Sequence, residues 1–533
     1  MTSPLSRSRS RRAPSHIAVR VAHVALGGLV AVGWLVLPLA GAGADGPAAV
    51  ARSTGVTAPP AAAPQQGTST GDLVPPLVAV GAAGALAAYG YARRRRRATT
   101  RTTPGGGPEP TPLHELDRQG RQLLVDIDDC VRVGAEELGL AADRSAGDAV
   151  EPYVYALRHA EAELATAFLL RQRLDEAEAS GRGPAEDDSR EVLEEIVARC
   201  QDAGRRLDAA APGFDQLRAL ERNAAAALEA AETRFRDVTA RTPAAEVTLA
   251  DLHKRYAPAT SLPVVGDVEQ AKDRLVFTTF HLNQARQYAD RGDGAKAAAH
   301  LRAAEGAVGQ AADLVDGVDR LAAELASAAA ELPAALTAVE SVRNAARERA
   351  RDTAHARPSP ASAVLVGQLG RTEALLCGVR QETAAGPYDP LDALRRVVGA
   401  AEGLAGAGGG DVPNGPAHAL LPARSALLGA AGFIGTHRGA VGSEARTRLA
   451  EAARLLGSGA VPLAGVRRAD ELAREARRLA ERDVRAYGNP AGGLGGAGAG
   501  GAVLGGVLLS DGDGGPVSYG GPRTRGRRSA SFT

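Results

Sequence analysis

The strongest constraint on the fold is the spacing of apolar residues, which follows one face of an α-helix through most of the chain. Between residues 113 and 490, apolar side chains recur at steps of three and four positions rather than two. The clearest run contains Ala297, Leu301, Ala304, Val308, Ala311, Val315, Val318, Ala322 and Leu325. Two further runs are Leu193, Ile196, Cys200, Ala203 and Leu207, and Leu217, Leu220, Ala224, Ala227, Ala231 and Val238. This spacing predicts an all-α body over residues 113–490.

Alanine occupies many positions of these runs, and aromatic residues make up only 3% of the chain. Because alanine buries less area than leucine, a single helix pair would be weak, and several helices must share a core. Glycine-rich breaks at 291–294 and 457–459 predict antiparallel hairpins with coiled-coil packing, the first between helices at 267–290 and 295–327 and the second over 443–485. Loops are expected at 257–263 and 406–414. Tetratricopeptide hairpins are an alternative, but no repeat recurs at a fixed 34-residue period.

The charge of the chain is unevenly distributed. The totals nearly cancel, with 63 Lys and Arg against 62 Asp and Glu, but basic residues outnumber acidic ones near the two ends, so residues 113–490 carry a net negative charge. Nucleic-acid binding requires clustered cations to replace the counterions of the phosphates. The acidic body therefore argues against nucleic acid as a partner.

The first 44 residues have the pattern of a secretory signal peptide. Five arginines precede the apolar stretch from Val21 to Ala40, and Ala42 and Ala44 supply the small residues of a cleavage site. An uncleaved transmembrane helix is the alternative, because 20 apolar residues also suffice to span a bilayer. Residues 45–72, rich in Pro, Ala, Thr, Gly and Gln, then predict a flexible extracytoplasmic linker.

A second apolar segment, residues 73–92, predicts a transmembrane helix in the lipid bilayer, because its 20 uncharged residues reach about 30 Å. Five arginines follow at once and should determine the topology: Arg93, Arg94, Arg95, Arg96 and Arg97. Such a cationic flank stays on the cytoplasmic side. With the first segment cleaved, we expect a single-pass protein of the cell membrane with a basic juxtamembrane linker at 93–112 and a cytoplasmic C-terminal region.

The C-terminal residues 491–533 are rich in glycine and end in several arginines. A segment of this composition offers little apolar surface to offset its backbone entropy, so the sequence predicts a disordered tail. Its glycine run imitates a phosphate-binding loop, but no strand precedes it and no amphipathic helix follows it.

Residues with catalytic or metal-binding potential are scattered. Cys130, Cys200 and Cys377 lack the paired spacing of zinc or redox sites, and Cys200 lies on a helical stripe. His281 and His300 flank the turn at 291–294 and could approach each other, but no carboxylate spacing completes a ligand set. The acidic groups Asp126, Asp128, Asp129, Glu186, Asp187 and Asp188 are interpreted as solvated charges or helix-start signals. We therefore expect no cofactor, no metal and no enzymatic activity.

Several segments together resemble one known family. They are DLVPPLVAVGAAGALAAYGYARRRRRATTRTTPGGG at 72–107, HLNQARQYADRGDGAKAAAHLRAAEGAV, GPYDPLDALRRV at 386–397, THRGAVGSEARTRLAEA at 436–452, and ERDVRAYGNP at 481–490 before a glycine tail with TRGR. This succession is similar to actinobacterial TPM domain-containing membrane proteins. The resemblance, over about residues 72–528, implies a signal peptide, an extracytoplasmic TPM domain, one transmembrane helix and a cytoplasmic coiled coil.

The TPM domain, which in some members is associated with phosphatase activity and calcium, has no room in this sequence. Only 28 residues lie between the expected cleavage site and the second apolar segment, whereas a folded domain needs at least ~50. No catalytic or metal residue is therefore carried over from the family. The leading hypothesis is a non-catalytic, membrane-anchored helical scaffold that binds a protein partner or self-associates through its helices. The alternative is a truncated, phosphatase-like TPM-family protein, or an accessory to an intact homologue.

Overall fold

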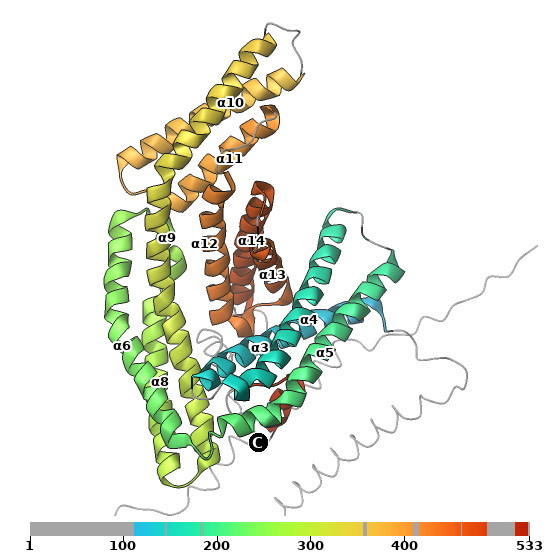
Figure 1. Ribbon diagram of the computed structural model, residues 1–533, viewed down its shortest axis with the longest axis vertical. Helices are drawn as coiled ribbons and strands as arrows, with labels where there is room; N and C mark the ends of the chain where they lie inside the picture. Colours follow the sequence, from blue (N-terminus) through green and yellow to red (C-terminus); the bar gives the residue numbers. More distant parts are fainter. Residues whose placement is uncertain are drawn as a thin grey trace, which may run out of the picture. The chain divides into compact units, whose positions relative to one another are not determined.

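A computed structural model describes residues 111–143, 147–181, 183, 185–354, 360–408, 415–459, 461–487 and 518–530 (Figure 1). All of them belong to one compact unit, Pro108–Thr533. The expected signal peptide, extracytoplasmic linker and transmembrane helix, together with residues 93–110 and their five consecutive arginines, lie outside the described residues.

Every regular element in the described part of the chain is helical, which confirms the all-α fold class. The longer helices are α3 (Leu113–Ala142), α4 (Gly147–Ala179), α5 (Glu186–Arg218), α6 (Ala224–Arg255), α8 (Asp267–Asp290), α9 (Gly294–Ala354), α10 (Pro360–Ala385), α11 (Pro390–Gly408), α12 (Gly415–Thr436), α13 (Ser443–Gly457) and α14 (Leu463–Tyr487). The shorter ones are α7 (Pro258–Ser261), η2 (Leu262–Val264), η3 (Arg438–Ala440) and α16 (Pro522–Ala530).

The helices pack in neighbouring groups that follow the chain (Figure 1). Helices α3, α4 and α5 share one core, which includes Leu124, Ile127 and Phe214. Helix α9 packs against α6 and α8 in its first half and against α10, α11 and α12 further along. Helices α12, α13 and α14 pack on one another, and α13 also contacts α3 and α4. Small side chains permit these close helix contacts. Each group of helices buries more apolar surface than a single helix pair could bury.

The apolar run of α9 lies in the core. Ala297, Leu301, Ala304, Val308, Ala311, Val315 and Val318 are all buried. The turn at residues 291–293 joins α8 to α9, and α13 and α14 form the second hairpin. Helix α9 continues to Ala354, well beyond the expected end at 327, and carries Pro333 inside it.

One apolar run that was expected to lie on a single helix is divided between two helices. The apolar spacing from Leu217 to Val238 suggested one continuous helix, but α5 ends at Arg218 and α6 begins at Ala224. Ala219 closes α5 in the left-handed conformation, with φ 43°. Leu220 is nevertheless buried. It therefore packs into the core from the connection between the two helices and not from a helix face. The expected loop at 257–263 is also largely helical, because it contains α7 and most of η2.

The expectation of a disordered tail is wrong for its last part. Residues 518–521 are buried against the α3–α5 core, and α16 follows them. Tyr519 is fully buried among aromatic side chains from other helices, which supplies the apolar contact that the glycine-rich composition lacks. Residues 491–517 and 531–533, the rest of the expected tail, lie outside the described residues.

Two described helical segments, Gly294–Asp352 and Gly415–Thr436, are long and apolar enough to cross a membrane by length and composition. Both are packed against other helices of the compact unit, and α9 carries the buried Glu305 close to its start. Core helices pass the same test of length and hydropathy, so this finding is weakly consistent with membrane association.

Candidate functional site

A cavity of about 670 Å³ lies between the helix groups and is the strongest candidate for a functional site. Its walls come from α3, α6, η2, α8, α9, α12, η3 and α14, and thus from segments more than 300 residues apart in the sequence. A volume of this size accommodates a small organic molecule.

Glycines of two helices keep the cavity open. Gly306 and Gly309 of α9, and Gly429 and Gly432 of α12, line it, and a Cβ atom added at any of them would meet nothing within 4 Å. Alanine would therefore fit at each position, and glycine inside a helix costs about 1 kcal/mol relative to alanine. These glycines are not needed for close helix packing; what they provide is space.

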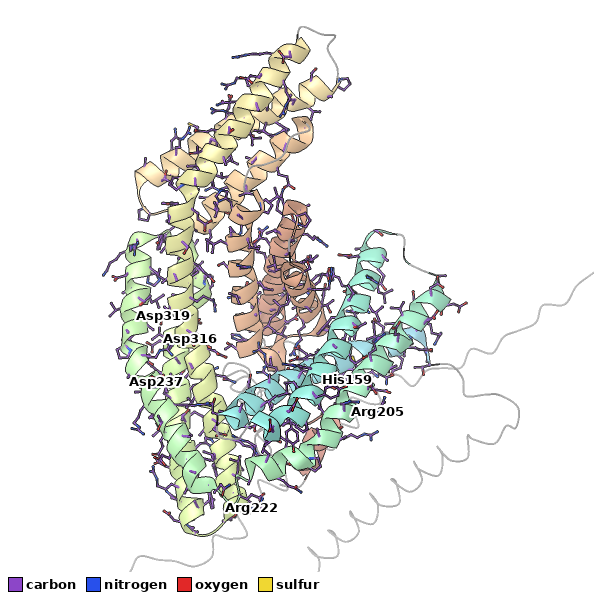
Figure 2. The ribbon with its side chains drawn as sticks, viewed as in Figure 1. His159, Arg205, Arg222, Asp237, Asp316 and Asp319 are labelled. Atoms are coloured by element: carbon purple, nitrogen blue, oxygen red, sulfur yellow. The ribbon has the colours of Figure 1, made fainter. Side chains whose placement is uncertain are left out.

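Most charged groups of the wall are neutralised by partners on other helices. Arg438 of η3 pairs with Glu136 of α3 at 2.8 Å, and Arg241 of α6 pairs with Asp316 of α9. Figure 2 shows Asp237 on α6, and Asp316 and Asp319 on α9, beside this junction. Such pairs hold the helices together across the cavity.

A second, deeper ion-pair group lies at the meeting point of α3, α5 and α9. The guanidinium of Arg218 contacts the carboxylates of Glu137 at 3.2 Å and Glu305 at 2.5 Å, and all three residues are buried. Burial raises the pKa of Glu137, although Arg218 opposes this rise. Removing one member would leave a buried charge without its partner, which is strongly destabilising.

Three carboxylates that line the cavity form no ion pair with any described residue: Asp237, Asp267 and Asp313. Burial raises the pKa of Asp267 to about 6, even though Arg477, Arg320 and Arg274 favour its ionised form. Desolvation also raises the pKa of Asp313, and Glu136 adds to that rise. A carboxyl group with a raised pKa inside a cavity is typical of a functional site.

Arginines surround the Asp267 end of the cavity. Arg477 of α14 lies over the ring of Phe433 at 3.9 Å from its centroid, pairs with Glu481 and donates to the carbonyl of Gly429. Arg274 is only 2% exposed, and its Nη2 has no hydrogen-bond partner in the described structure. Burial lowers the pKa of His437, and Arg477 and Arg274 lower it further.

The two histidines singled out in the sequence do meet. Nδ1 of His281 on α8 lies 3.0 Å from Nδ1 of His300 on α9, and Tyr288 stacks on His300. Burial lowers the pKa of His281 to about 4, and His300 adds to the effect. Among the described residues, no group of three or more His, Cys, Asp or Glu is placed to hold a metal ion. The pair is thus a neutral hydrogen-bonded contact within the hairpin.

The cysteines lie apart. Cys130 and Cys200 are buried in the α3–α5 group, and Cys377 is exposed on α10. Burial raises the pKa of Cys130 to about 11 and that of Cys200 to about 12, so both thiols are protonated at neutral pH. A thiol in this state is a poor nucleophile.

The interpretation of Asp128 and Asp129 as solvated charges is wrong. Both contact the guanidinium of Arg446 on α13, at 2.5 and 2.7 Å, and Arg446 is only 2% exposed. Glu186, Asp187 and Asp188 do lie in the first turn of α5, as a helix-start signal should. The sequence could not show the pairing because Arg446 lies more than 300 positions away.

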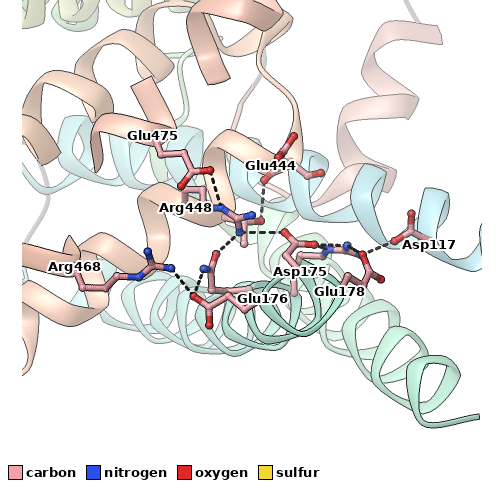
Figure 3. Close-up of polar contacts among 12 residues, drawn as sticks. Asp117, Asp175, Glu176, Glu178, Glu444, Arg448, Arg468 and Glu475 are labelled. Carbon is pink, nitrogen blue, oxygen red and sulfur yellow. Dashed lines mark hydrogen bonds and ion pairs between the residues drawn. The ribbon is translucent and has the colours of Figure 1, made fainter. Parts of the chain in front are cut away.

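Further arginines fasten α4 to the α13–α14 hairpin (Figure 3). Arg448 contacts Gln172 at 2.5 Å and Asp175 at 3.1 Å, and Arg468 contacts Glu176 at 2.8 Å. Asp175 also pairs with the buried Arg171 of its own helix. Arginines therefore supply, at the contacts between helix groups, part of the cohesion that the alanine-rich seams lack.

The cavity residues could not be identified from the sequence. Asp267 and Asp313 stand among many acidic residues, and nothing in the local pattern distinguishes them. The usable signal was the glycine spacing on α12, where Gly429, Gly432 and Gly435 recur every third position on one face.

The fold and the cavity define an all-α protein with a cavity between its helix groups. Two proteins of Mycobacterium tuberculosis are similar to this chain: UPF0603 protein MT2410 from strain CDC 1551 / Oshkosh and UPF0603 protein Rv2345 from strain ATCC 25618 / H37Rv. Each is 30% identical over 437 residues, covering 77% of this chain and 65% of the relative. The chain thus spans somewhat less than two thirds of the length of these relatives. No family model matches the chain, and no solved structure matches it.

Proposed function

We propose that this protein is a membrane-anchored, non-catalytic helical scaffold whose cytoplasmic body binds a small organic cation in the cavity. The segment 73–92 is the proposed anchor, and Arg93–Arg97 hold the body on the cytoplasmic side. The observation that carries the proposal is the cavity, because helices of several groups contribute to its wall. A ligand in this position would contact those groups at once and favour the arrangement that a protein partner meets.

The charges of the wall indicate the class of ligand. Asp237, Asp267 and Asp313 are without an ion pair among the described residues, whereas most lining arginines have carboxylate partners. Arg132 of the wall and the neighbouring Arg274 likewise form no ion pair with a described residue, so three carboxylates without an ion pair stand against two such guanidinium groups. The carboxylates do not gather into a metal-ion site in the described structure, which favours an amine whose charges are spread along a carbon chain.

A thermal-shift titration of the full chain in detergent with spermidine tests this proposal. We expect a concentration-dependent rise in Tm that is reduced at least fivefold in Asp313→Asn, because a lost counter-charge weakens binding of the amine. Asp319→Asn is the matched control, since Asp319 is not among the residues that line the cavity. No rise with spermidine, or an equal rise in both variants, would overturn the cationic ligand.

An enzymatic role is the second candidate, and Asp267 is the observation that favours it. A carboxyl group with a pKa of about 6 in a cavity has the properties of a general acid or base. The test is release of nitrophenol from p-nitrophenyl phosphate by the purified full chain, compared with a heat-inactivated sample. We expect no release above that control. Release that disappears in Asp267→Asn would favour the enzyme and contradict the scaffold.

A further inference from the structure

The C-terminal residues 518–526 occupy a cleft of the α3–α5 group in the manner of a bound peptide. We call residues 518–526, SYGGPRTRG, the docking segment. The docking cleft is the surface that receives it: Cys130 and Gly134 of α3, Tyr153 of α4, and Gly204, Asp208, Ala211 and Phe214 of α5. The cleft and the segment are more than 300 residues apart in the chain.

Tyr519 is the anchor of the docking segment. Its ring is fully buried, stacks on Phe214 at 4.4 Å between centroids, and meets the edge of Tyr153 at 6.1 Å. Its hydroxyl donates a hydrogen bond to the carbonyl oxygen of Tyr153 at 3.0 Å. A tyrosine with both its ring and its hydroxyl satisfied in a pocket is the usual form of a hot spot in protein recognition.

The two glycines that follow Tyr519 are required by the fit. A Cβ atom at Gly521 would lie 2.2 Å from the carbonyl oxygen of Gly204, which no side chain tolerates. Gly520 has φ +142°, and its Cβ would lie 3.1 Å from that of Ala211. The cleft is matched in turn, because a Cβ at Gly204 would lie 3.0 Å from the ring of Pro522. The cleft and the docking segment therefore fit closely where Gly204 meets Gly521 and Pro522.

The cleft also caps the helix that the docking segment begins. Oδ1 of Asp208 accepts a hydrogen bond from the backbone N–H of Thr524 at 2.9 Å, and Oδ2 accepts one from that of Arg523 at 3.3 Å. A carboxylate at this position satisfies orphan donors in the first turn of α16. Arg525 reaches Sγ of Cys130 at 3.4 Å from the other side. The cleft thus contacts the side chain of Tyr519, the backbone of the docking segment and the first turn of α16.

The length of chain between the body and the docking segment allows a second geometry. Helix α14 ends at Tyr487, and the 30 residues 488–517 separate it from Ser518. Thirty residues span at most about 100 Å when extended. All of the contacts above are made by residues 519–525, so none of them requires residues 488–517.

We propose that the cleft is a peptide-docking site for the Tyr-Gly-Gly-Pro sequence, and that a second copy of this chain supplies that sequence when two copies lie side by side. The segment of the same chain competes, since covalent linkage makes its binding to the cleft intramolecular. Docking between copies therefore becomes measurable when the segment of the same chain is removed from the cleft. This inference does not depend on the cavity or its ligand.

The first experiment uses a fluorescent peptide of residues 515–530 and the full chain in detergent. Gly521→Val in the full chain should vacate the cleft through its clash with Gly204, and the peptide should then bind with micromolar Kd. The unchanged chain should bind it at least tenfold more weakly. A Tyr519→Ala peptide should lose at least tenfold in affinity, whereas Arg523→Ala, an exposed side chain, should stay within twofold. Tyr519→Ala in the full chain provides a second vacated cleft if the valine variant does not fold.

A mixing experiment tests the second copy. Gly204→Val blocks the cleft and leaves the segment, and Gly521→Val blocks the segment and leaves the cleft. In one nanodisc, the two variants together should form a cross-linkable dimer, and neither should do so alone. If the vacated chain fails to bind the peptide, or binds the Tyr519→Ala peptide equally well, the docking site is refuted. Peptide binding without a mixed dimer would refute the role of the second copy.

Discussion

At the scale of single residues, the buried carboxyl group of Asp267 lowers the stability of the protein at neutral pH. Its pKa is raised from 3.8 to about 6, so the folded state holds the proton more tightly than the unfolded chain does. Stability is therefore lost as pH rises through the window from about 4 to about 6, and the penalty remains at neutral pH. We expect Asp267→Asn to raise the free energy of unfolding by about 1 kcal/mol at pH 7.5 and to leave it unchanged at pH 4.

Denaturant unfolding of the full chain at the two pH values measures this difference. Asp319→Asn, in which an exposed carboxylate is neutralised, should change stability by less than about 0.5 kcal/mol at either pH. A loss of stability in Asp267→Asn at pH 7.5 would contradict the raised pKa.

His281 has the opposite pH dependence. Burial holds its pKa near 4 instead of 6.5, so the unfolded chain binds a proton that the folded chain rejects between these values. Its contribution to stability is complete above pH 6.5 and is lost as pH falls toward 4. We expect His281→Gln to flatten the fall in Tm between pH 6.5 and 4.5, whereas replacement of the exposed His253 by Gln should leave the slope as it is. An unchanged slope in His281→Gln would show that other groups set the acid response.

At the scale of the helices, the connection between α5 and α6 stores backbone strain. Ala219 has φ 43° and ψ 34°, a left-handed conformation that costs a non-glycine residue about 1–2 kcal/mol. We expect Ala219→Gly to stabilise the protein by about 0.5 kcal/mol, the remainder being lost to the greater freedom of glycine in the unfolded chain. At Ala226, exposed within α6, the same substitution should destabilise by about 1 kcal/mol. Equal destabilisation at both positions in thermal unfolding would contradict the strained geometry.

At the scale of the whole molecule, the expected topology places the body and its cavity on the cytoplasmic side. The reason is the run Arg93–Arg97 directly after an uncharged segment of bilayer length. Protease added to intact protoplasts should leave residues beyond 98 uncut, and the same protease should cut them after lysis. Cleavage near residue 120 or 200 in intact protoplasts would contradict this topology. Replacing the five arginines by asparagine should give a mixture of molecules inserted in both orientations in the membrane.

The sequence by itself determined the helical class and the buried face of α9, because helical period is a local property. It indicated only that His281 and His300 could approach each other across the turn. It could not give the environment of Asp267, since burial and the arginines that face it come from α9 and α14 as well as from its own helix. Likewise, the composition of residues 518–526 predicts disorder until Phe214 and Tyr153 surround Tyr519. Only the tertiary structure decided these points, because burial and charge compensation depend on residues distant in the chain.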